Sequence, residues 1–255
     1  MPARLVFWFL LCAAFAAAQP QRFVFAVIAD PQIGMKEEAA DRGQFARVVA
    51  AVNALKGPSR PDFVLLAGDL INDAASQTQW SAMDTIRKTL EYPFYSVAGN
   101  HDPKPEGAGG RFFFEHKGCL FLGLDSNLWS ARTQEPARAQ FAWLEEQLRA
   151  RERHRLVFVL QHHPVYLHDP QEKDEYFNIP VEWRSRLLKL FEEARVTAHI
   201  AGHLHRNTTG WHRGLAMLVT PSSLNNFDSI PPGFRLVEVN SAGFNETYVV
   251  VNMQP

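Results

Sequence analysis

Residues 23–32 read FVFAVIADPQ, an apolar run that ends directly in Asp30 and Gln32. A short run rich in Val, Ile and Phe predicts a buried β-strand. The same arrangement recurs four times: Phe63 to Asp69, Phe94 to Asp102, Leu156 to His163 and Val196 to His205. In an α/β fold with mostly parallel strands, the carboxyl ends of the strands open onto one edge of the sheet, where ligands bind. We therefore expect the polar residues that end these runs to meet.

Between the first three runs, stretches near 37–56 and 77–90 have helical character, which gives alternating strands and helices. Short apolar runs and turns such as Pro231-Pro-Gly233 over residues 216–251 predict an antiparallel second sheet. The fold class expected is α/β: two stacked mixed β-sheets flanked by helices in a four-layer α-β-β-α sandwich. Further expected elements are a hairpin over 111–125, a strand ending at Gln161, and helices near 136–152 and 181–194.

The composition is that of a soluble globular domain. The chain has 255 residues, 46% of them apolar and 21% charged, which is enough to build a sizeable core. A formal net charge of −1 provides no large basic field, so nucleic acid is not expected as a main partner.

The first residues have the pattern of an export signal. A basic start at Arg4 is followed by an apolar stretch from Leu5 to Phe15 and by Ala16-Ala17-Ala18, an A-x-A cleavage site. We expect residues 1–18 to be a cleaved signal peptide and 19–255 to form a single domain. The alternative, a retained membrane anchor, is disfavoured because a spanning helix needs about 20 apolar residues. The expected location is periplasmic or secreted, without membrane contact beyond export; the oligomeric state stays open.

Five motifs, in order along the chain, resemble the calcineurin-like metallophosphoesterase family. They are Asp30-x-Gln32, Gly68-Asp69, Gly99-Asn-His-Asp102, His162-x-Pro164 and Gly202-His-Leu-His205. Closer matches are similar to the branch called calcineurin-like phosphoesterase domain-containing protein 1; they are Ala29-Asp-Pro-Gln32, Gln161-His162, Tyr176-Phe-Asn178 and Gly202-His-x-His-Arg-Asn207. The resemblance spans most of the mature chain and implies a metal-dependent phosphoric ester hydrolase with a dinuclear centre.

The resemblance also implies the metal ligands. Asp69 would bridge two divalent cations. Asp30, Gln32 and His205 would complete the first site, and Asn100, His162 and His203 the second. Imidazole, carboxylate and amide donors suit Mn, Fe or Zn. Two cations about 3.5 to 4 Å apart would let a metal-bound hydroxide attack phosphorus while both neutralise the phosphate.

Gln32 departs from the usual family pattern, which has His at this position. An amide oxygen is a harder and weaker donor than an imidazole nitrogen. Either Gln32 binds through its carbonyl oxygen, or the first site lacks one protein ligand and holds its metal loosely.

His101 and Asp102 are the expected catalytic residues. The resemblance implies that His101 faces the substrate, where it would stabilise charge or protonate the leaving oxygen. Asp102 would orient that ring, or merely cap the turn before Pro103; both readings stay open. The His-x-Pro pattern favours His162 over His163 as ligand, and the long loop from Val165 to Asn178 is expected to line the substrate cleft.

The branch resemblance implies a phosphate ester as substrate, in the first place a phosphomonoester such as phosphoserine or phosphothreonine on protein. Two alternatives remain from the sequence: a phosphodiesterase, or a non-catalytic metal- or phosphate-binding protein of the same fold, suggested by Gln32.

Overall fold

The computed structural model describes residues 22–102, 110–130 and 134–252. The predicted signal peptide lies outside these ranges. Within them, no helix has the length and apolar character required to cross a membrane.

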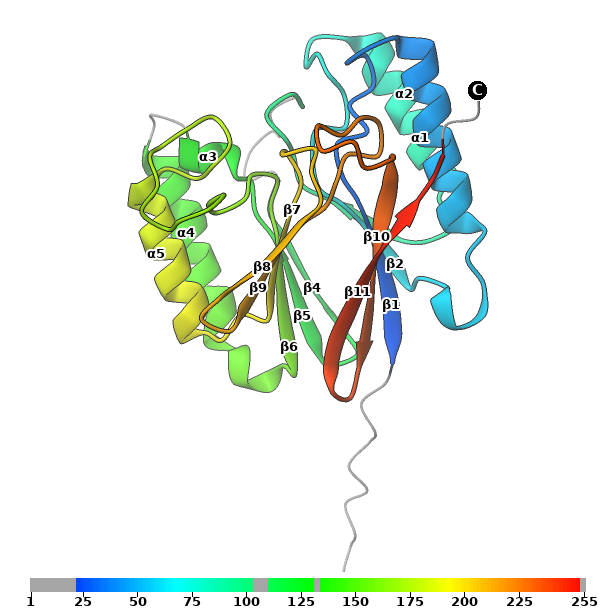
Figure 1. Ribbon diagram of the computed structural model, residues 1–255. Coiled ribbons are helices and arrows are strands. Elements are labelled where there is room, and N and C mark those ends of the chain that lie inside the picture. The colour runs from blue at the N-terminus through cyan, green and yellow to red at the C-terminus, as the bar shows by residue number, and fades with distance from the viewer. Residues whose placement is uncertain (1–21, 103–109, 131–133, 253–255) are drawn as a thin grey trace, which may run out of the picture.

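The first sheet has five strands in the order β11-β10-β1-β2-β3. They are β1 (Phe23–Ile28), β2 (Phe63–Leu66), β3 (Phe94–Ser96), β10 (Gly233–Asn240) and β11 (Gly243–Val250). The first three run parallel, whereas β10 is antiparallel to both β1 and β11. Helices α1 (Glu38–Asn53) and α2 (Gln77–Arg87) cover the outer face of this sheet (Figure 1), and the short helix η1 (Gly57–Ser59) precedes β2.

Helix α1 forms where the apolar spacing is helical. The apolar positions recur at i, i+3, i+4 and i+7: Phe45, Val48, Val49 and Val52. All four are buried between the helix and the outer face of the sheet. The carboxylate of Glu37 accepts hydrogen bonds from the first backbone amides of the helix, which stabilises its start.

The second sheet has six strands in the order β4-β5-β6-β7-β9-β8. They are β4 (Phe112–His116), β5 (Cys119–Gly123), β6 (Leu156–Leu160), β7 (Ala198–Ala201), β8 (Thr208–His212) and β9 (Leu215–Val219). The inner four run parallel, and the edge strands β4 and β8 are antiparallel to their neighbours. On the outer face lie α3 (Asn127–Ser130), α4 (Gln134–Arg149) and α5 (Val181–Glu193) (Figure 1), and η2 (Arg151–Arg153) leads into β6.

The expected two mixed sheets between helical layers are therefore present, but the prediction that residues 216–251 form a second antiparallel sheet is wrong. Strand β9 joins the six-stranded sheet, parallel to β7, and the β10–β11 hairpin extends the first sheet beside β1. The local pattern of turns identified the hairpin correctly. Which sheet it joins depends on a pairing of Phe23 with Val239, more than two hundred residues apart in the chain.

The two sheets pack face to face through aromatic rings. Phe25 meets Phe121 edge to face at 5.3 Å between centroids, and Phe121 stacks on Phe158 at 5.0 Å. In β1, Phe25 and Val27 point into this core, while Ala26 and Ile28 pack under the helices. Because β1 is buried on both faces, its sequence is continuously apolar rather than alternating.

Candidate metal centre

The predicted ligands follow the carboxyl ends of β1, β2, β3, β6 and β7, as the sequence analysis expected. Backbone hydrogen bonds join the first two of these loops: the amide of Asp30 donates to the carbonyl of Gly68 at 3.1 Å, and that of Gln32 to the carbonyl of Asp69 at 2.9 Å. The two loops therefore form one support for both predicted sites.

The backbone at the predicted ligands is strained. Positive φ angles occur at Asp30 (48°), Gln32 (34°), Asp69 (48°), His203 (69°) and His205 (48°). For residues with a side chain this region costs about 1 to 3 kcal/mol each and persists only where the surroundings enforce it. Such strain gathers at functional sites.

Gly99 is required for close packing at the centre. A Cβ atom there would lie 2.1 Å from Oδ1 of Asp69. The missing side chain is what lets the loop after β3 approach the Asp69 carboxylate and bring Asn100 beside it.

Three donor atoms of the predicted second site converge on His162. Its Nε2 lies 3.3 Å from Oδ2 of Asp69, 3.2 Å from Oδ1 of Asn100 and 3.1 Å from Nδ1 of His203. Asp69, His162 and His203 are all buried, and their donor atoms lie within 4.8 Å of one another.

The ring nitrogens of His162 and His203 that point away from this cluster already make hydrogen bonds. Nδ1 of His162 donates to the carbonyl of Ala67 at 2.8 Å, and Nε2 of His203 to the carbonyl of Tyr176 at 3.1 Å. In the neutral rings the inner nitrogens then carry lone pairs that face each other. Two facing lone pairs beside a carboxylate require a positive charge between them, so these residues fit a metal cation.

The electrostatics point the same way. Burial lowers the pKa of His162, but the carboxylates of Asp69 and Asp30 outweigh it and raise the pKa to about 10. Burial, together with the charge on His162, lowers the pKa of His203 to about 4. Burial raises the pKa of Asp69, yet His162 holds it below its usual range. One proton on His162 thus occupies the place that suits a cation.

The predicted first site is built around Asp30, which is fully buried. Nε2 of His205 lies 3.5 Å from Oδ1 of Asp30, while its Nδ1 donates to the carbonyl of Asn225 at 2.7 Å. The amide nitrogen of Gln32 donates to Oδ1 of Asn72 at 3.3 Å, and its buried Oε1 has no hydrogen-bond partner. A buried carbonyl oxygen without a partner fits the alternative in which Gln32 is a ligand through that oxygen.

His101 lies beside the carboxylate of Asp69. Its backbone amide donates to Oδ1 of Asp69 at 2.9 Å, and its Nδ1 lies 2.8 Å from the carbonyl of Asn72. That carbonyl places the proton of the neutral ring on Nδ1, so Nε2 carries a proton only in the imidazolium form.

Asp102 does not orient the His101 ring. Its Oδ1 accepts from the amides of Leu70 (2.7 Å) and Ile71 (3.2 Å), and its Oδ2 from the amide of Gly99 (2.8 Å). The structure corrects the predicted catalytic role: Asn72 orients the ring, and Asp102 ties the loops after β2 and β3 together. Burial raises the pKa of Asp102 to about 6.

Two aromatic residues that the sequence did not single out as site residues flank the ligands. Tyr176, in the loop expected to line the cleft, accepts a hydrogen bond from Nδ2 of Asn100 at 2.7 Å. Phe227, 56% exposed, stacks on His205 with centroids 5.0 Å apart and planes at 13°. Phe227 lies among polar turn residues in the sequence, and that pattern does not indicate a position beside the predicted ligands. His163 instead contacts the hydroxyl of Ser126 at 2.8 Å and leaves His162 as the converging ring.

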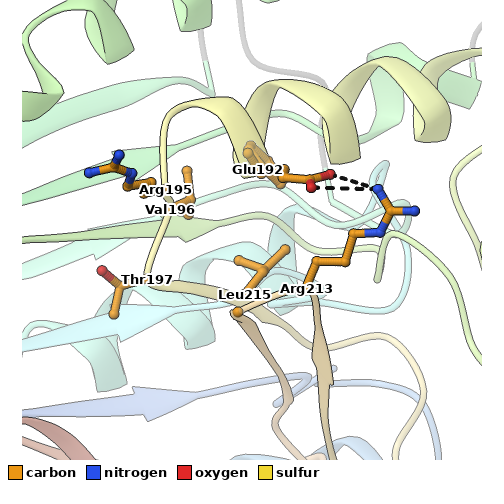
Figure 2. A pocket seen from close by; sticks show the side chains of 8 residues that line it. Glu192, Arg195, Val196, Thr197, Arg213 and Leu215 are labelled. Atoms are coloured by element: carbon orange, nitrogen blue, oxygen red, sulfur yellow. Dashed lines mark hydrogen bonds and ion pairs between the residues drawn. The ribbon is translucent and has the colours of Figure 1, made fainter.

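A pocket of about 260 Å³ lies elsewhere, between the end of α5 and the start of β9. Figure 2 shows Arg213 paired with Glu192 across it, beside Thr197 and Leu215. These last two residues stand at the amino ends of β7 and β9, at the edge of the sheet opposite the predicted ligands. None of the ligands lines this pocket.

The profile of the Calcineurin-like phosphoesterase family matches residues 23–207, which include all seven predicted ligands. The chain belongs to this family. It is therefore a hydrolase that acts on phosphoester bonds, and the non-catalytic alternative is set aside.

Two relatives that match most of the chain have the same name. The protein called Serine/threonine-protein phosphatase CPPED1 in Danio rerio is 32% identical over 89% of this chain and 84% of its own length. The human protein of that name is 33% identical over 86% and 81%. A more distant relative, named Probable glycerophosphodiester phosphodiesterase GpdQ in Arcobacter nitrofigilis, is 27% identical over 68% and 66%.

Solved structures agree on the fold. The Plasmodium protein described as GAP50, the anchor in the inner membrane complex, superposes with a TM-score of 0.65 at 17% identity, over 90% of this chain and 84% of that one. TT1561 of Thermus thermophilus gives a TM-score of 0.56 at 11% identity, over 89% and 99%.

Proposed function

We propose that the protein is a phosphatase that hydrolyses phosphomonoesters with two divalent cations, Mn, Fe or Zn. The observation that carries the proposal is the convergence of His162, His203 and Asp69 on one point, with the inner nitrogens of the two rings 3.1 Å apart. The unpartnered Oε1 of Gln32 supports a second cation beside Asp30 and His205.

When bound, the cations would supply an activated water and neutralise charge on the phosphate. The protein's own residues do the rest. Asp69, whose carboxylate contacts His162, would be shared by the two cations and balance part of their charge. Asp102 holds the loops that carry Asp69 and Asn100. The carbonyl of Asn72 fixes the His101 ring, so that in the imidazolium form its Nε2 can donate a proton to the leaving oxygen.

The monoester assignment rests on relatives. Those named Serine/threonine-protein phosphatase are 31–33% identical over 69–84% of their length, whereas the diesterase-named Arcobacter relative is 27% identical over 66%. We therefore place phosphoserine and phosphothreonine on protein first among substrates, with a phosphodiester as the second candidate.

The test is a turnover panel with phosphoserine, phosphothreonine and phosphotyrosine peptides, p-nitrophenyl phosphate and bis-p-nitrophenyl phosphate, each with Mn²⁺, Zn²⁺, Mg²⁺ and Fe²⁺. We expect the monoesters to be preferred by at least about tenfold in kcat/KM, which is a difference of about 1.4 kcal/mol in barrier. A diester turned over faster than every monoester would reverse the assignment.

We further propose that the chain is exported. Sequencing the amino terminus of protein purified from its native host tests this directly: Gln19 is expected as the first residue, and a terminus at Met1 would contradict export by cleavage.

A further inference from the structure

Tyr176 contacts two ligands of the predicted second site at once. Its hydroxyl oxygen accepts a hydrogen bond from Nδ2 of Asn100 at 2.7 Å, and its backbone carbonyl accepts from Nε2 of His203 at 3.1 Å. Its ring also packs against that of His203, with centroids 5.0 Å apart. Yet the side chain is 60% exposed and belongs to a loop, not to a strand end.

Other ligands take their support from the strand framework. His162 donates to the carbonyl of Ala67, one residue beyond β2, and His203 and Asp30 are joined through the backbone amide of His203 at 3.0 to 3.1 Å. Asn100 is exposed, and its amide oxygen faces Nε2 of His162 while its amide nitrogen faces Tyr176. The plane of the Asn100 amide is thus set by the loop.

The loop is built firmly enough to do this. Arg184 of α5, fully buried, donates to the backbone carbonyls of Ile179, Pro170 and Glu172 at 2.9, 3.1 and 2.7 Å. Asn178 closes the turn that contains Tyr176 by accepting from the amide of Glu175 at 3.0 Å. Tyr176 is therefore presented from a fixed backbone.

We propose that Tyr176 is a positioning residue for the second cation: its hydroxyl holds the Asn100 carbonyl toward the cation, and its carbonyl sets the His203 ring. Affinity at the second site is then coupled to the conformation of the loop that borders the substrate cleft. The inference rests on the metal centre of the proposed function, but not on the identity of the substrate.

The test titrates metal-free protein with Co²⁺ in the absence of substrate, following visible absorption and the heat of binding. Tyr176→Phe keeps the ring and the backbone carbonyl and removes only the hydroxyl. We expect Co²⁺ to bind about 10-fold more weakly at the second site, the lower end of the effect of losing such an outer hydrogen bond, with affinity at the first site unchanged. Tyr166→Phe is the matched control, since that hydroxyl lies in the same loop and contacts Nδ1 of His212 at 3.3 Å, away from the ligands.

A double-mutant cycle separates positioning from a general structural effect. If the hydroxyl acts through Asn100, Tyr176→Phe should have no further effect on Co²⁺ affinity in an Asn100→Ala background. Wild-type affinity and absorption in Tyr176→Phe, or equal effects of Tyr176→Phe in both backgrounds, would overturn the proposal. Because no turnover is measured, absent phosphatase activity would count against the proposed function alone.

Discussion

At the residue scale, the centre depends most on Asp69, whose carboxylate contacts His162 on one side and the His101 amide on the other. Asp69→Asn should lower metal content at both sites and reduce turnover by about 10² or more, because a neutral amide bridges two dications poorly. Elemental analysis after desalting measures this. Asp62→Asn is a control, since that carboxylate pairs with His116 and Lys117 before β2. Two tightly held ions in Asp69→Asn would refute the bridging role.

His101 is expected to act on the substrate without holding metal. His101→Ala should reduce kcat by about 10² or more, the range for a lost proton donor or charge stabiliser. Metal content should stay unchanged, because the contact with Asp69 is made by the backbone amide, which alanine keeps. Metal lost together with activity would make His101 a ligand instead.

Gln32 should control the affinity of the first site. Gln32→His replaces an amide oxygen with imidazole, the better donor for borderline metals, so the first cation should bind more tightly. Calorimetric titration of the wild type and of Gln32→His with Zn²⁺ compares their affinities at the first site. Equal first-site constants would mean that Gln32 does not determine them.

At the scale of elements, the loop over residues 165–178 is organised by one carboxylate. Glu172 accepts from the amides of Leu167, His168 and Asp169, and from Nδ2 of Asn178. Although burial raises the pKa of Glu172, these donors lower it from 4.5 to about 2. A depressed pKa means that the stabilisation is present above about pH 4.5 and is lost as pH falls toward 2.

Hydrogen exchange of the loop amides, corrected for intrinsic rates, should therefore lose protection between pH 4.5 and 2 before the sheets do. Glu172→Gln should lower protection of residues 167–178 already at neutral pH. Glu175→Gln, an exposed change in the same loop, should not. Unaltered protection in Glu172→Gln would show that the carboxylate does not order the loop.

The sequence indicated that the predicted ligands share one edge of the sheets, where the structure has them, but it did not indicate which residues support them. Asp30, Asp69 and His162 follow buried apolar runs, and strand direction brings such residues to one edge. Asp102 could not be assigned, because a carboxylate that accepts three backbone amides and one that orients an imidazole look the same in a local pattern. Tyr176 and Phe227 reach the ligands through loop conformations that neither periodicity nor turn residues specify.

At the scale of the whole molecule, the predicted ligands come from both sheets. Asp30, Asp69 and Asn100 follow strands of the first, and His162, His203 and His205 follow strands of the second. Bound cations would link the two layers, so chelation with EDTA should lower the melting temperature. Binding only the folded state stabilises by about 2.7 kcal/mol per site at a free concentration of 100 times Kd. Calorimetry with and without Mn²⁺ measures the shift in melting temperature. An equal shift in Asp69→Asn would mean that the stabilising cations bind outside the predicted sites.

The packing of phenylalanine between the sheets has a spectroscopic consequence. The tryptophans that the structure describes lie under the helices or on the surface: Trp80, Trp129, Trp143, Trp183 and Trp211. The rings between the sheets are instead Phe23, Phe25, Phe63, Phe121 and Phe158, with Phe114 and Tyr95 at one side. Tryptophan emission thus reports on the outer layers and changes little with the packing between the two sheets. If the helical layers detach before the core between the sheets opens, tryptophan emission and circular dichroism will follow different unfolding curves. A two-state fit to either curve alone would then give a wrong free energy of unfolding.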